Sequence, residues 1–227
     1  MKVIANSQGI VGLQVSADDV TPKSQIMMRD IIEFIAQSYQ FAVKPQIPPN
    51  IPPFMIPIFV FQSGQFVIGD EKLPIIQLAV IQNGDIVTAS TTEVADRILD
   101  DFMSRMDSNF GYRFGEAVEK TRSYMSSFVV EFDKPLEEKI SALKRFEEIL
   151  NGASIRSEPF KIKRLAFGSG DIQQLQSISS IDEMKKSDFF IERRVGEPYA
   201  RNRYFCSAPM KTADHVKLLE LIERELS

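Results

Sequence analysis

Apolar residues follow two periods along the chain, which together predict a mixture of helices and strands. A spacing of three to four residues, typical of an amphipathic helix, occurs in residues 22–40, from residue 91 to Gly111, in residues 135–150 and from Thr212 onward. Short apolar runs predict strands at residues 9–15, 58–61, 65–68, 73–81, 85–89, 124–132, 160–167, 189–195 and 201–207. We therefore expect an α+β fold in which antiparallel β-hairpins are covered by amphipathic helices.

Turn and cap residues punctuate this pattern. Predicted hairpin turns lie at Ser63-Gly64, at Asn83-Gly84 and around Gly196, and Asn-Gly is the pair that best suits a two-residue turn. Ser90-Thr91-Thr92-Glu93 matches the capping box that begins many helices. Pro135 and the pair Asn151-Gly152 predict the two ends of the helix over residues 135–150.

The order of predicted elements repeats once along the chain. Residues 1–118 form an N-terminal α+β half, residues 119–227 form a C-terminal α+β half, and both read as β-α-β-β-β-α. The turns at Asn83 and Gly196 lie 113 residues apart, and so do Pro22 and Pro135. Residue identities between the halves are weak, so an internal duplication and an ordinary α+β topology both stay open.

A proline-rich strap interrupts the first half at residues 44–57. Its six prolines exclude a helix or a central strand and favour an extended polyproline-type segment. Two PxxP spacings are present, yet the strap is also rich in apolar residues, which favours packing against its own fold or against a sister subunit. We expect the interface to use Ile51, Phe54, Met55 and Ile56.

Composition argues against several classes of protein. The chain has 27 basic and 31 acidic residues, a net charge of -4, which disfavours a protein built as a whole to coat nucleic acid or an anionic membrane. Residues 1–8 lack the pattern of a signal peptide, and the longest apolar run, residues 51–61, is too short and too rich in proline to span a membrane. The single cysteine allows no intrachain disulfide. These features predict a cytoplasmic protein without a membrane segment.

Candidate catalytic residues are few. Cys206 lies nine residues before His215, the only histidine, and the two form a weak candidate for a nucleophile and its base. A buried cysteine and a structural histidine are the more common roles of such residues. The chain has no zinc-binding spacing and no complete phosphate-binding glycine loop, so we expect no metal and no cofactor.

Basic and aromatic residues gather late in the chain, in the predicted C-terminal hairpin. Arginines interleaved with aromatics bind phosphates and bases, and protein interfaces are enriched in the same residues. Nearby acidic residues also offer internal ion pairs. The candidate binding residues are Arg193, Arg194, Tyr199, Arg201, Arg203 and Tyr204.

The sequence thus favours a non-enzymatic interaction or assembly subunit that associates with itself or with a protein partner. The alternative is a nucleic-acid or nucleotide-binding module that uses the basic hairpin. A weaker alternative is a hydrolase or transferase that depends on Cys206 and His215.

Overall fold

The structure is a computed structural model that describes residues 1–15, 28–46, 58–81, 84–112, 121–153, 161–168, 181–185 and 187–225. Within these residues eight strands form one sheet in the order β2-β3-β4-β1-β5-β8-β7-β6, and every neighbouring pair is antiparallel. The predicted α+β class with antiparallel strands and covering helices is confirmed.

The bounds of the elements follow the two sequence periods. The strands are β1 (Lys2–Gln14), β2 (Phe59–Ile68), β3 (Glu71–Ile81), β4 (Gly84–Ala89), β5 (Thr121–Glu131), β6 (Arg164–Phe167), β7 (Phe189–Arg193) and β8 (Arg203–Ala208). The helices are α1 (Met28–Ser38), α2 (Thr92–Phe110), α3 (Leu136–Lys139), α4 (Ser141–Ala153), α5 (Ile181–Lys185) and α6 (Thr212–Glu225), with a 3-10 turn η1 at Tyr199–Arg201.

The two halves of the chain meet in the middle of the sheet, where β1 pairs with β5. Read from its outer edge, the first half contributes β2, β3, β4 and β1, and the second contributes β6, β7, β8 and β5. The order of strands is therefore the same in both halves. A duplication requires this order, but unrelated chains also reach it, so the duplication stays a prediction.

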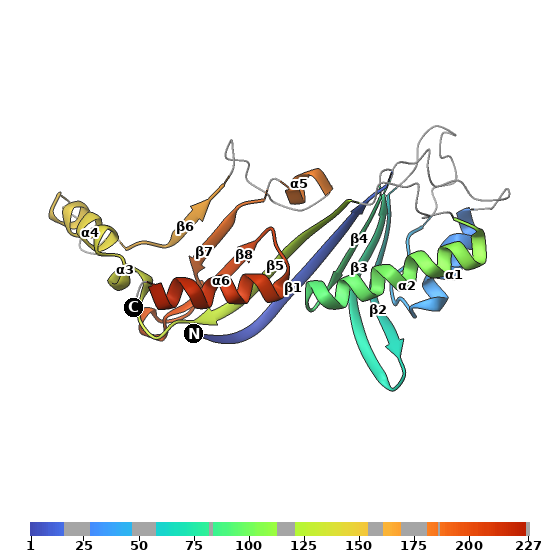
Figure 1. Ribbon diagram of the computed structural model, residues 1–227, viewed down its shortest axis with the longest axis horizontal. Helices are drawn as coiled ribbons and strands as arrows, with labels where there is room; N and C mark the ends of the chain where they lie inside the picture. Colours follow the sequence, from blue (N-terminus) through green and yellow to red (C-terminus); the bar gives the residue numbers. More distant parts are fainter. Residues whose placement is uncertain are drawn as a thin grey trace.

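Helices cover the two faces of the sheet unequally. Figure 1 shows α1, α2 and α6 along one face, which we call the helix face. On β1, Val11 packs into the cluster beneath α1 and α2, whereas its neighbour Ile10 packs with Ile181 and Met184 of α5 on the opposite face. Successive side chains of a strand point to opposite faces, so α5 lies on the face away from the other helices.

The N-termini of α2 and α6 meet head to head above the central strands. The backbone N–H of Thr92 donates to the Thr212 hydroxyl at 3.0 Å, and the backbone N–H of Thr212 donates to the Thr92 hydroxyl at 2.7 Å. Each threonine thus caps the other helix. Gly9 of β1 makes room for this contact, because a Cβ there would lie 2.1 Å from the backbone nitrogen of Thr92.

Glu93 supplies negative charge where the two positive helix ends converge. Its carboxylate accepts a hydrogen bond from the Ala213 backbone N–H at 3.2 Å. Burial alone would raise the pKa of Glu93, but hydrogen bonds from its own N–H, from Ala213 and from the threonine hydroxyls lower it. The predicted capping box therefore works differently from its expected form: Thr91 is the N-cap of α2, and Glu93 reaches the neighbouring helix.

The predicted hairpin at Ser63-Gly64 is wrong. β2 continues through both residues, and the connection to β3 comes at Gly69, whose φ of 57° suits a tight turn. Ser63 instead forms an irregularity in β2, with a φ of 57° and a carbonyl that accepts from the Ala42 N–H at 3.1 Å. Ser63 and Gly64, which are typical of turns, thus lie at a local distortion of β2.

The predicted single helix over residues 135–150 is also wrong. Ile140 takes an extended conformation, with φ −106° and ψ 94°, and divides the segment into α3 and α4. Helix α4 then continues through Asn151 and Gly152, which were expected to end it. The strand expected at residues 160–167 is short, because β6 begins only at Arg164.

The junction between α2 and α6 gives a first prediction. Thr212→Val and Thr92→Val should each lower the free energy of unfolding by about 1 kcal/mol, the usual value of an N-cap. Because each residue is the partner of the other, the double variant should lose less than the sum of the two. Urea unfolding at pH 7 measures all three, with Thr121→Val at the exposed first residue of β5 as a control. Additive losses would show that the caps act independently.

Candidate interaction surface at the edge of β6

Strand β6 is the outermost strand at the C-terminal end of the sheet. Its neighbour β7 occupies one side, and no strand among the described residues occupies the other. Helix α4 lies beyond its beginning (Figure 1). We name the outer edge of β6, together with the exposed side chains of Phe146, Ile149, Leu150 and Phe167, the β6–α4 surface.

The pattern of hydrogen bonds shows which backbone groups of β6 point outward. The Arg193 N–H donates to the Lys163 carbonyl at 2.8 Å, so these two residues form a hydrogen-bonded pair. Such pairs alternate in an antiparallel ladder, which assigns Leu165 and Phe167 to the pairs bonded with β7. The N–H and C=O groups of Arg164 and Ala166 therefore face the outer edge.

Helix α4 provides a hydrogen-bond partner only for the outward N–H that precedes β6, that of Ile162. A carboxylate oxygen of Glu147 accepts a hydrogen bond from the Ile162 N–H at 2.6 Å. Ile162 precedes Arg164 by two residues, so its N–H points to the same side of the strand as those of Arg164 and Ala166. Its bond to Glu147 therefore agrees with the outward direction of these backbone groups.

The apolar side of α4 stays uncovered. The structure records no buried side chain in this helix. Leu143 and Glu147 turn toward the sheet, whereas Phe146 is 57% exposed and Ile149 is 61% exposed. An amphipathic helix normally buries its apolar stripe, so the exposure of Phe146 and Ile149 makes α4 a candidate interaction surface.

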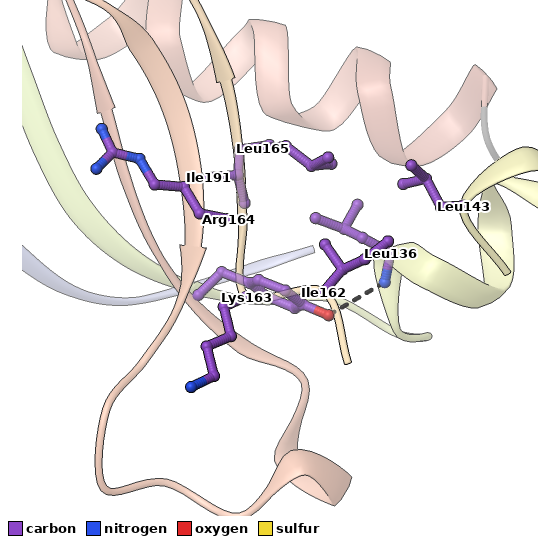
Figure 2. Close-up of a pocket in the computed structure, with 8 residues that line it drawn as sticks. Leu136, Leu143, Ile162, Lys163, Arg164, Leu165 and Ile191 are labelled. Carbon is purple, nitrogen blue, oxygen red and sulfur yellow. Dashed lines mark hydrogen bonds between the residues drawn. The ribbon is translucent and has the colours of Figure 1, made fainter. Parts of the chain in front are cut away.

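A shallow apolar pocket lies between α3, α4 and the strands. Its empty volume is about 220 Å³, including space open to solvent. Figure 2 shows Leu136, Leu143, Ile162 and Leu165 around it, with the Leu136 N–H bonded to the Tyr204 hydroxyl at 3.1 Å. Lys163 and Arg164 point away from the pocket. The pocket is small and mostly apolar.

The β6–α4 surface is positively charged, although the chain as a whole is negative. Among residues 141–153 and 161–168, five side chains are basic and two are acidic, and one of those two is Glu147. Arg164 lies with its guanidinium 4.1 Å from the centre of the Phe190 ring, on the face away from α6. Lys144, Arg145, Lys161 and Lys163 are exposed.

The basic hairpin is held together by ion pairs. Arg203 bonds Glu131 at 2.9 Å and Glu197 at 3.2 Å, and Arg201 bonds Glu197 at 3.1 Å. Glu197 is close to Arg201 and Arg203 in the sequence, so these pairs could be expected. Glu131 was not, since it lies on β5 and meets Arg203 only because β5 pairs with β8.

The other candidate binding residues of the hairpin differ in exposure. Arg193 is buried, with its guanidinium 4.8 Å from the centre of the Tyr204 ring, which is also buried. Arg194 is exposed. Tyr199 lies in the 3-10 turn η1. The hairpin therefore brings these residues into one region, but it turns only part of their charge toward solvent.

Cys206 and His215 are both completely buried. Burial raises the pKa of the Cys206 thiol, which disfavours the reactive thiolate. The Nδ1 of His215 lies 2.9 Å from the hydroxyl oxygen of Ser126, and its ring centre lies 4.4 Å from that of Phe128. The sequence analysis missed Ser126, which only the packing of α6 on β5 brings to the histidine.

Three remaining expectations concern the strap, metals and membranes. Residues 47–57 lie outside the described residues, so the structure does not test the expected interface at Ile51, Phe54, Met55 and Ile56. No group of three metal-ligating side chains occurs in the described part of the chain. No described helix has the length and apolar character needed to cross a membrane.

Comparisons with protein-family models and with curated proteins find no match for this chain.

The two arginines of the basic hairpin should respond differently to charge reversal. Arg203→Glu would place a third carboxylate beside Glu131 and Glu197, so we expect a clear fall in melting temperature. Arg201, which is 57% exposed and has one partner, should tolerate the same change with little effect. Thermal melts at pH 7 compare the two variants. Equal melting temperatures would show that the ion pairs of Arg203 are not structural.

The buried histidine should make stability depend on pH. Burial lowers the pKa of His215 from 6.5 to about 4, so the unfolded chain binds a proton more readily than the folded protein. Stability is therefore complete above pH 6.5 and falls as the pH drops toward 4, with a loss of about 2 kcal/mol at pH 5. Proton NMR of this single imidazole and urea unfolding of the protein and of His215→Gln would measure it. A His215 pKa near 6.5 would contradict the prediction.

Proposed function

We propose that this protein is a non-enzymatic interaction or assembly subunit of the cytoplasm that docks a partner chain on the β6–α4 surface. The observation that carries the proposal is the uncovered apolar side of α4, beside the outermost strand of the sheet. An amphipathic helix that buries no side chain gains little stability from packing, so its apolar stripe is better explained by a binding partner.

Helix α1 supports this interpretation because it holds the equivalent place in the first half. It follows β1 as the short α3 and then α4 follow β5, and it buries Ile31, Ile32, Ile35 and Ala36 in the core. The same position in the order of elements thus gives a packed helix in one half and an exposed helix in the other. Packing of the protein's own core does not account for the apolar residues of α4.

The burial of Cys206 and His215 supports a role without catalysis. A substrate reaches neither side chain in the folded protein, and the neutral thiol is a poor nucleophile. Ser126 and His215 also lie within hydrogen-bond distance, but both are fully buried.

A nucleic-acid-binding module is the second candidate. It is favoured by the neighbouring rings of Phe190 and Phe205, whose centres lie 5.8 Å apart with planes tilted by 45°, and by Arg164 against the first ring. Aromatic rings on a sheet face can stack on bases of a single strand. Against this candidate, Glu131 and Glu197 hold Arg203 in ion pairs, which reduces the charge available for phosphates.

Position-specific photo-cross-linking in the native host tests the proposal. A photoreactive amino acid at Phe146 should give a discrete protein adduct, because this side chain lies in the middle of the uncovered stripe. The same residue at Leu221, an exposed apolar position on α6, is the matched control and should give none. The mass of the adduct distinguishes a second copy of the 25.7 kDa chain from another protein.

A third probe position separates the two candidate functions. Val195, 91% exposed in the basic hairpin, should cross-link to nucleic acid if the second candidate is right. Identical adducts at Phe146 and Leu221 would contradict docking on the β6–α4 surface.

A further inference from the structure

We infer that the occupant of the β6–α4 surface is an extended, acidic segment of another protein, which adds to the sheet as a further strand beside β6. This inference deepens the proposed function and rests on it. It follows from three properties of the surface: the direction of its backbone groups, its charge, and the way the opposite edge of the same sheet is covered.

The backbone of β6 offers a short ladder to an incoming strand. The outward N–H and C=O groups of Arg164 and Ala166 are two residues apart, which is the repeat at which a neighbouring antiparallel strand forms its bonds. Both residues are exposed. Glu147 closes the ladder at Ile162, and so fixes where the added strand ends. This is the geometry of recognition by strand addition.

The opposite edge of the sheet shows how an extended segment covers such a strand. β2 occupies in the first half the place that β6 occupies in the second. Two hydrogen bonds join Val43 to Gln62 of β2, with lengths of 3.2 and 3.0 Å, and Ala42 donates to Ser63. The chain itself thus adds a short extended segment to that edge. At β6 an extended segment, rather than a helix, is the corresponding occupant.

Charge decides between a second copy and a different partner. Two β6 strands paired with each other would bring Lys163 and Arg164 of one copy against the same cations of the other, and like charges across a strand pair are destabilising. Lys144 and Arg145 of α4 add to the repulsion. An acidic strand avoids this cost and is attracted from a distance.

The two faces of the added strand meet different surroundings. Arg164 points to the face that carries Phe190, whereas Leu165 points into the apolar pocket beside α3 and α4. An alternation of acidic and apolar residues therefore suits the site, with the acidic residues on the side of Arg164 and the apolar residues on the side of the pocket.

The test uses the full chain and a synthetic peptide of nine residues in which glutamate alternates with valine. Amide hydrogen exchange measured by NMR should slow at least tenfold at Arg164 and Ala166 when the peptide saturates the site. The amide of Leu165, which already belongs to a pair bonded with β7, is the internal control and should change little. A peptide in which lysine replaces glutamate should bind at least tenfold more weakly.

Two variants probe the backbone and the charge separately. Ala166→Pro removes an outward N–H without removing a bond to β7, so binding should fall at least tenfold while the melting temperature barely changes. Lys163→Glu with Arg164→Glu should weaken the glutamate peptide at least tenfold and strengthen the lysine peptide. Lys217→Glu with Arg224→Glu, the same charge change on exposed positions of α6, is the matched control.

Three other occupants of the surface would each give a different result in these measurements, and each result would overturn the inference. Slow exchange at Arg164 and Ala166 in the free protein would mean that the chain covers its own edge. Slowing that grows with protein concentration would indicate a second copy. Chemical-shift changes on α4 without slower exchange on β6 would indicate a helical ligand. If Phe146 still gives a cross-link in any of these cases, the proposed function stands and only the identity of the occupant is wrong.

Discussion

The head-to-head contact between the N-termini of α2 and α6 is the constraint around which the two halves are organised. Two positive helix ends repel each other unless their N–H groups find acceptors. Thr92 and Thr212 provide these acceptors reciprocally, and Glu93 adds a carboxylate at the same place. The contact sits directly on β1, where Gly9 has no side chain to keep the helix away. One helix from each half thus meets over the pair β1–β5, and both halves share one sheet.

Hydrophobic periodicity predicted α1, α2, α6 and most strands, because both kinds of element depend on short-range spacing. The segments that were mispredicted are those in which a local signal has two structural outcomes. Ser63-Gly64 is compatible with a turn and with a local distortion of a continuous strand. The Phe41 ring lies against Gly64 in the folded chain, and no residue near Gly64 in the sequence predicts this contact. Ile140 continues the apolar period of a helix, yet its backbone is extended.

The candidate site was harder to predict than the fold, because its character depends on long-range neighbours. Lys163 and Arg164 lie in a segment that the sequence predicts as a strand, but nothing local shows that this strand lies at the edge of the sheet. The sequence indicated the basic hairpin as the stronger candidate for binding. In the structure, however, Arg203 of this hairpin is paired with Glu131, which lies on β5, 72 residues earlier in the chain. His215 likewise meets Ser126 only after the sheet is assembled.

The two ends of the sheet use the same order of elements for opposite purposes. At the first end, α1 buries its apolar stripe and the residues that follow it bond to the edge of β2. At the second end, α4 has no fully buried side chain and contributes a single carboxylate to the edge beyond β6. Edge strands without a cover expose a protein to unwanted pairing, and charged side chains are a common protection. In the strand addition that we propose, Lys163 and Arg164 would disfavour pairing between copies, and the same charges would favour an acidic strand. In that complex, one set of side chains would provide both the protection of the edge and its selectivity.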